Sequence, residues 1–112
     1  MTLTPFHHGT LHTILAELRS RLEGLYGSRL LHLVLYGSQA RDDATPDSDI
    51  DVLVVLQGPV QPGEEIRSTG GIVADLSLWY GVVIACVFMD EEQFMQGQGP
   101  LRRNVRREGI AV

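Results

Sequence analysis

The feature that most constrains this chain is the seven-residue run Ile50–Leu56, which is rich in valine and contains one charged residue, Asp51. A continuous apolar run of this length, bounded by Gly58 and Pro59, predicts a strand that is buried inside a sheet. An unpaired charge in such a strand costs several kcal/mol. Asp51 is therefore poorly explained as part of a solvated loop, although a loop predicted over residues 42–48 accounts well for Asp42, Asp43 and Asp47.

Helical patterns and two further apolar runs surround this strand. Leucine and isoleucine recur at helical spacing between Leu11 and Leu25, with Thr10 as a cap and Gly27 as a stop, which predicts a helix that ends near Tyr26. The remaining expected elements are strands at Leu30–Tyr36 and Val82–Met89, and helices at Ser38–Arg41, Pro62–Tyr80, Glu91–Gln96 and Leu101–Glu108.

This order of elements predicts a single domain over residues 1–112. Its class is α/β (α+β), with a small three-stranded mixed sheet flanked by helices. Gly70 and Gly71 weaken the helix that contains them by roughly 1 kcal/mol each, so a break or a late start in that helix stays open. The edges of so small a sheet need cover, which leaves a protein partner or a homo-oligomer open.

Composition and charge exclude several classes of function. The net charge of −5 argues against duplex nucleic acid as the main partner, because phosphate binding needs a basic surface. The single cysteine, Cys86, excludes an intramolecular disulfide and a cysteine zinc cluster. The first ten residues do not resemble a signal peptide, and no apolar run reaches the roughly 18 residues of a membrane helix. We therefore expect a cytoplasmic protein that does not contact a membrane.

Arginine is concentrated near the end of the chain, at Arg102, Arg103, Arg106 and Arg107. A cluster of this kind is usually a solvated helix face. Arg103 and Arg107 share one helical edge, however, and that edge could meet an acidic partner.

Gly37 and Ser38 directly follow an expected strand and open the short helix at Ser38–Arg41. Glycine lets the backbone come close to a ligand, and amides at the start of a helix attract phosphate. A glycine–serine pair after a strand is usually a tight turn, so this feature alone indicates little.

A pair of carboxylates stands at the start of the buried strand. Asp49 and Asp51 are separated by one residue, so their Cα atoms are expected roughly 6.5–7 Å apart on one face of the strand. At this spacing two carboxylates can reach one hard cation, or a close pair of cations, from the same side. Ile50 and Val52 alternate onto the opposite face, toward the core.

The two segments together are Gly37-Ser38-Gln39-Ala40-Arg41 and Ser48-Asp49-Ile50-Asp51-Val52, with ten residues between Ser38 and Asp49. This two-part motif resembles the signature of the DNA polymerase β-like nucleotidyltransferases. The likeness covers most of the chain. It is greatest to the minimal nucleotidyltransferases (MNT), many of which are encoded beside a HEPN-domain protein, and the ending from Pro100 to Gly109 also resembles that group.

By this resemblance, Gly37 and Ser38 would hold the triphosphate of ATP, and Arg41 would lie near the phosphates or brace the loop. Asp49 and Asp51 would be the catalytic carboxylates and would bind Mg²⁺ or Mn²⁺. The partner would be a HEPN ribonuclease, which the chain would neutralise as an antitoxin by binding it, by attaching AMP to it, or both.

Active members of this family usually carry a third carboxylate on the next core strand. The expected strand at Val82–Met89 contains no acid. Cys86 is a poor ligand for a hard cation and is better explained as a small core residue. The nearest acids in sequence, Asp75, Asp90 and Glu91, do not match the family's position.

Three functions stay open on the sequence alone. The first is metal-dependent transfer of AMP to a protein acceptor, which the motif supports and the missing third acid opposes. The second is a weakly active or inactive binding module that masks a HEPN partner, which the small size and the basic ending favour. The third is a transferase acting on a small molecule or RNA, which the acidic balance and the short chain disfavour.

Overall fold

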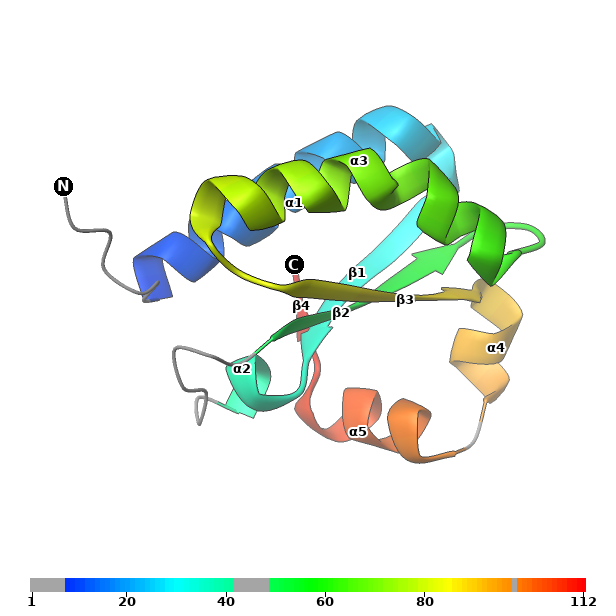
Figure 1. Cartoon of the computed structure of the whole chain (residues 1–112). Helices are drawn as coiled ribbons and strands as arrows, with labels where there is room; N and C mark the ends of the chain where they lie inside the picture. Colours follow the sequence, from blue (N-terminus) through cyan, green and yellow to red (C-terminus); the bar gives the residue numbers. More distant parts are fainter. Residues whose placement is uncertain (1–7, 42–48, 98) are drawn as a thin grey trace, which may run out of the picture.

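The structure is a computed structural model that describes residues 8–41, 49–97 and 99–112 (Figure 1). All helices and strands that the sequence predicts are present, so the α/β (α+β) class is confirmed. In chain order, the elements are α1 (His8–Tyr26), a 3-10 turn (Gly27–Arg29), β1 (Leu30–Tyr36), α2 (Ser38–Arg41), β2 (Ile50–Leu56), α3 (Pro62–Tyr80), β3 (Ile84–Asp90), α4 (Glu91–Gln96), α5 (Pro100–Glu108) and β4 (Ile110–Ala111).

The strands form one mixed sheet in the order β3-β2-β1-β4. β1 pairs antiparallel with β2 and with β4, and β2 pairs parallel with β3. The expectation of three strands is corrected, because Ile110–Ala111 adds a fourth strand beside Val34 and Leu35 of β1. Two residues are too few to show an alternating pattern, so only the tertiary pairing reveals this strand.

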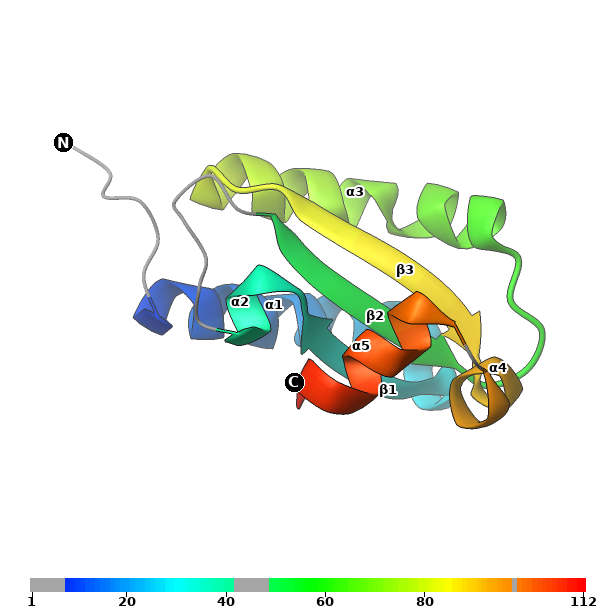
Figure 2. The same ribbon diagram turned by 90° about the horizontal axis from the view of Figure 1, so that it is seen from below.

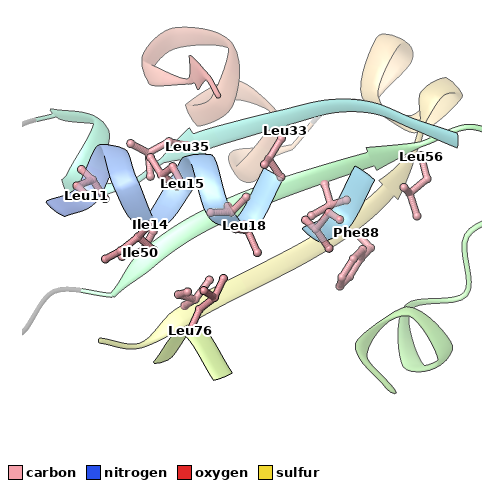
Figure 3. Packing of buried hydrophobic residues seen from close by; sticks show 14 residues of the cluster. Leu11, Ile14, Leu15, Leu18, Leu33, Leu35, Ile50, Leu56, Leu76 and Phe88 are labelled. Atoms are coloured by element: carbon pink, nitrogen blue, oxygen red, sulfur yellow. The ribbon is translucent and has the colours of Figure 1, made fainter. Parts of the chain in front are cut away.

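Helices cover both faces of the sheet. Figures 1 and 2 show α1 and α3 on one face and α4 and α5 on the other. The main core lies under α1 and α3, and burying each aliphatic side chain there contributes roughly 1.5–3 kcal/mol. Figure 3 labels its members Leu11, Ile14, Leu15, Leu18, Leu33, Leu35, Ile50, Leu56, Leu76 and Phe88.

The alternation of side chains along β2 decides where Asp51 points. Ile50 and Val52 belong to the main core, as the sequence predicts. Leu53 belongs to a second, smaller core together with Val105 of α5. Since successive side chains point to opposite faces, Asp51 lies on the face of Leu53, which α5 covers.

The two long helices carry one buried side and one polar side. Leu18 of α1 and Leu76 of α3 are fully buried, whereas Arg21 of α1 pairs with Asp75 of α3 at 3.3 Å on the outside. No helix within the described ranges is both long enough and apolar enough to cross a membrane.

α3 is continuous through both of its internal glycines, so Gly70 and Gly71 neither break the helix nor delay its start. Both glycines are exposed. The helix ends at Gly81, whose φ of 65° places it in the left-handed region that favours glycine.

β3 begins at Ile84, two residues later than the sequence predicts. The backbone N–H of Val82 bonds to the carbonyl of Ser77 at 3.1 Å, which closes the end of α3. Val82 therefore completes the helix end and does not join the strand.

Replacing Gly70 or Gly71 by alanine is expected to stabilise the protein by about 0.5–1 kcal/mol each, because alanine loses less backbone entropy in a helix. A Cβ atom at either position would meet no atom within 4 Å. Urea unfolding measures the change. Gly81→Ala is the matched control and should destabilise the protein, because its φ is positive. A loss of stability in Gly70→Ala and Gly71→Ala would contradict this account.

Candidate active site

Gly37 joins β1 to α2 in a conformation that a side chain would disturb. Its φ is +77°, in the left-handed region. A Cβ atom at this position would lie 2.5 Å from Oδ2 of Asp51, closer than nonbonded atoms approach. The backbone therefore favours glycine, and a side chain at this position would force the Asp51 carboxylate to move. The sequence predicted that this glycine admits a ligand, and the described group that comes closest is Asp51.

The turn after Gly37 is short and well closed. The carbonyl of Gly37 accepts hydrogen bonds from the backbone N–H groups of Ala40 and Arg41, at 3.1 and 3.2 Å. Ser38 begins α2 and is half-buried. Amides at the start of a helix have no acceptor inside the helix and suit an anion. The turn therefore places the start of α2, with the Ser38 hydroxyl, directly after the glycine that Asp51 approaches.

Asp51 lies opposite Tyr36, its register partner in the β1–β2 pair. Burial, and then the charge of Asp49, raise the pKa of the Asp51 carboxyl above its usual value of 3.8, while Arg41 partly lowers it. The pKa of Tyr36 is raised as well, by burial and then by the charge of Asp51. The surroundings of Asp51 therefore oppose its ionisation, and a bound cation would favour it.

Asp49 is exposed and lies just before β2. The chain is fixed at this point because the N–H of Ile50 bonds to the carbonyl of Val83 at 2.8 Å. Asp49 and Asp51 carry like charges that repel each other. Such a pair fits Mg²⁺ or Mn²⁺, since Mg²⁺ commonly takes one or two protein carboxylates and completes its shell with phosphate and water.

β3, the strand beside β2, carries no third carboxylate next to this pair. Ala85 is the register partner of Asp51 and shares its face of the sheet. Cys86 pairs with Val52 and packs against the main core, which confirms that it is a small core residue. Burial raises the pKa of the Cys86 thiol to about 11. Among the described residues, no three His, Cys, Asp or Glu side chains gather closely enough to hold a metal ion.

The nearest acids in sequence have structural partners or face solvent. Asp75 bonds to Arg21 across the two long helices. Asp90 caps α4, where its carboxylate accepts a hydrogen bond from the N–H of Gln93 at 2.7 Å. Glu91 is exposed in the first turn of the same helix. None of these three acids therefore supplies a third carboxylate beside Asp49 and Asp51.

Arg41 is held by a residue from the far end of the chain. Its Nη1 lies 3.1 Å from Oε2 of Glu108, the last residue of α5. Figure 2 shows α2 and α5 on the same face of the sheet. The Glu108 side chain is 21% exposed and that of Arg41 is 45% exposed, so the pair is partly open to solvent.

The structure brings part of the predicted set of site residues together. Asp51 approaches Gly37, and the charges of Asp49 and Arg41 both act on Asp51. The sequence did not predict Glu108, since 67 positions separate it from Arg41 and only the packing of α5 brings them together. Tyr36 was also missed, although its place directly before Gly37 is a clue. The loop predicted over 42–48 lies outside the described residues.

A family model and a similar protein both relate the chain to nucleotidyltransferases. A family model described as a nucleotidyltransferase domain matches residues 15–112. A protein of Methanocaldococcus jannaschii, named provisionally as a protein adenylyltransferase, is 37% identical over 94 residues, which cover 83% of this chain and 88% of that protein. The family match includes every candidate site residue from Gly37 to Glu108.

Solved structures share the fold. One, described provisionally as a minimal nucleotidyltransferase, is 27% identical with a TM-score of 0.57, over 91% of this chain and 95% of that chain. Another comes from a complex of a tri-AMPylated Shewanella oneidensis HEPN toxin with an MNT antitoxin. It is 13% identical with a TM-score of 0.52, over 88% of this chain and 70% of that chain, and this likeness concerns the fold alone.

Asp51→Asn is expected to stabilise the metal-free protein at pH 7, by about 1 kcal/mol or less because the site is partly exposed. A carboxyl whose pKa is higher in the folded than in the unfolded state stabilises the fold at low pH. That contribution is lost as the pH rises through the folded pKa. Asparagine removes the cost of ionisation. The gain at pH 7 should therefore shrink near pH 4.

Thermal unfolding in the presence of a chelator measures this change. Asp75→Asn is the matched control, because the same replacement there breaks an ion pair with Arg21 and should give no gain. If Asp51→Asn lost stability at pH 7, the proposed cost of ionising Asp51 in the folded protein would be rejected.

Proposed function

Because this chain belongs to the nucleotidyltransferase domain family, we propose that it transfers AMP from ATP to a hydroxyl group of a partner protein. The observation that carries the proposal is the pair Asp49 and Asp51 beside the turn at Gly37. A metal-bound triphosphate needs carboxylates for the cation and helix-start amides for the phosphates, and the pair lies beside the turn that begins α2.

Each residue has a distinct role in this proposal. Gly37 and Ser38 bind the phosphates through backbone amides and a hydroxyl, and Arg41 contributes a nearby positive charge. Asp49 and Asp51 hold Mg²⁺ or Mn²⁺. When bound, the cation neutralises phosphate charge and helps to orient the attacking hydroxyl.

The reaction breaks one phosphoanhydride bond and forms one phosphoester bond. The acceptor oxygen attacks the α-phosphorus, the bond from that phosphorus to the bridging oxygen breaks, and pyrophosphate leaves with the electron pair. The hydroxyl proton passes to solvent. The residues named here bind and orient the nucleotide, which accounts for catalysis mainly by positioning.

The proposed partner is a HEPN-domain protein in a toxin–antitoxin pair in the cytoplasm. Support comes from the adenylyltransferase name of the relative and from the MNT–HEPN complex among the similar folds. The absence of an acid at Ala85 favours a second candidate function, in which the chain neutralises its partner by binding alone.

The basic side of α5 is the surface we propose for such a partner. Arg103, Arg106 and Arg107 are exposed and line one surface hollow. In the described part of the chain, none of these guanidinium groups contacts a carboxylate. An acidic partner face would complement them.

Arg103→Gln/Arg107→Gln should weaken binding to a co-purified HEPN partner about tenfold, with a larger loss at low salt. Truncation at Pro100 is a poorer test, because it also removes the buried Val105 and β4. Surface plasmon resonance measures the affinity, and Glu91→Gln/Glu92→Gln on α4 is the control. Unchanged affinity in the arginine variant would exclude this surface.

Calorimetric titration of ATP with Mg²⁺ tests the nucleotide site. The wild-type protein should bind ATP only with the metal, and Asp49→Asn/Asp51→Asn should lose binding by more than about tenfold, because two carboxylate ligands are removed. Glu91→Gln/Glu92→Gln removes the same charge from exposed positions at the other end of the sheet and should bind normally (Figure 1).

Transfer of label from α-³²P ATP to a protein acceptor separates the two candidate functions. Label that moves with the wild-type protein and not with Asp49→Asn supports the enzyme. Binding of ATP without transfer, together with intact partner binding, supports the binding module. A folded wild-type protein that binds neither ATP nor metal would reject the proposed site.

A further inference from the structure

Glu108 lies at the end of α5, and the segment that follows it packs closely on β1. Gly109 follows it, and a Cβ atom there would lie 2.5 Å from the carbonyl oxygen of Val105 and 2.7 Å from Cγ1 of Val34. β4 then pairs with Val34 and Leu35 of β1. The end of α5 therefore packs directly against β1, which places the Glu108 carboxylate beside Arg41 of α2.

The guanidinium group of Arg41 interacts with two carboxylates in different ways. It bonds to Glu108 at 3.1 Å. Its charge also acts on Asp51 and opposes the effects of burial and of Asp49 there. The backbone places Arg41 near Asp51, because the N–H of Arg41 bonds to the carbonyl of Gly37 at 3.2 Å and a Cβ atom at Gly37 would lie 2.5 Å from Oδ2 of Asp51. From this place its Nη1 bonds to the Glu108 carboxylate on α5.

A positive side chain this close to Asp51 competes with a metal ion for the same carboxylate. A guanidinium group bound to Asp51 in two-point fashion would occupy the oxygens that the cation needs. Glu108 does not itself complete a three-acid metal cluster, since the described residues contain no such group. Glu108 instead contacts Arg41, the group that would compete with the cation for Asp51.

We infer that Glu108 is a positioning residue that tethers Arg41 and so keeps the Asp51 carboxylate available to the divalent cation. This inference rests on the proposed function, because it assumes that Asp51 binds metal. It adds a residue from the far end of the chain to the site and gives the Arg41–Glu108 pair a purpose beyond stability. Partly exposed ion pairs contribute little to stability on their own.

A double-mutant cycle on metal affinity tests the tether. Mn²⁺ is titrated into the wild type, Glu108→Gln, Arg41→Gln and the double variant, and free Mn²⁺ is measured by electron paramagnetic resonance. Glu108→Gln should lower Mn²⁺ affinity about fivefold while Arg41 is present, the size expected for one partly exposed charge pair. In the Arg41→Gln background the same change should alter affinity by less than about twofold.

Two further measurements keep the result unambiguous. Glu92→Gln removes an exposed charge from α4 and should leave Mn²⁺ affinity unchanged. Circular dichroism checks folding. If Glu108→Gln does not fold, Arg41→Gln alone still tests the inference, because loss of the competitor should not weaken Mn²⁺ binding.

Equal losses from Glu108→Gln with and without Arg41 would overturn the inference, because simple charge removal predicts additivity. An unchanged affinity in Glu108→Gln would overturn it too. A folded wild-type protein that binds no Mn²⁺ would instead reject the proposed function on which the inference rests.

Discussion

The carboxylate of Asp51 lies against Gly37, and much of the site depends on this contact. A Cβ atom at position 37 would lie 2.5 Å from Oδ2 of Asp51, so a side chain there would displace this carboxylate. The positive φ of Gly37 turns the chain into α2 at the same point. One glycine therefore lets the Asp51 carboxylate lie beside the start of α2 at the end of the antiparallel β1–β2 pair.

The charges around that contact work against the folded protein when no cation is present. Burial and Asp49 make the ionised form of Asp51 costly, and Arg41 relieves this only in part. The main core under α1 and α3 supplies the stability that such a site requires. Functional sites often contain a group that lowers the stability of the folded protein, because the same group is needed for binding.

The sequence predicted those parts of the fold that local patterns encode. The bounds of β2 and the direction of Ile50 and Val52 follow from an apolar run and its alternation. β4 could not be predicted, because two residues carry no period and the strand exists only through its pairing with β1. Glu108 could not be predicted either, since its contact with Arg41 depends on how α5 packs across the sheet. The motif located the carboxylates, and the tertiary structure identified what surrounds them.

The most direct test of this account is the pKa of the Asp51 side chain, measured by carbon-13 NMR titration of the carboxyl group with and without Mg²⁺. Without metal, we expect a pKa above the ordinary 3.8, because burial and Asp49 disfavour the charged form. Addition of Mg²⁺ should lower it, because the cation favours the carboxylate. A raised pKa that Mg²⁺ lowers would support a carboxylate kept for a cation. An ordinary pKa that does not respond to Mg²⁺ would contradict that claim.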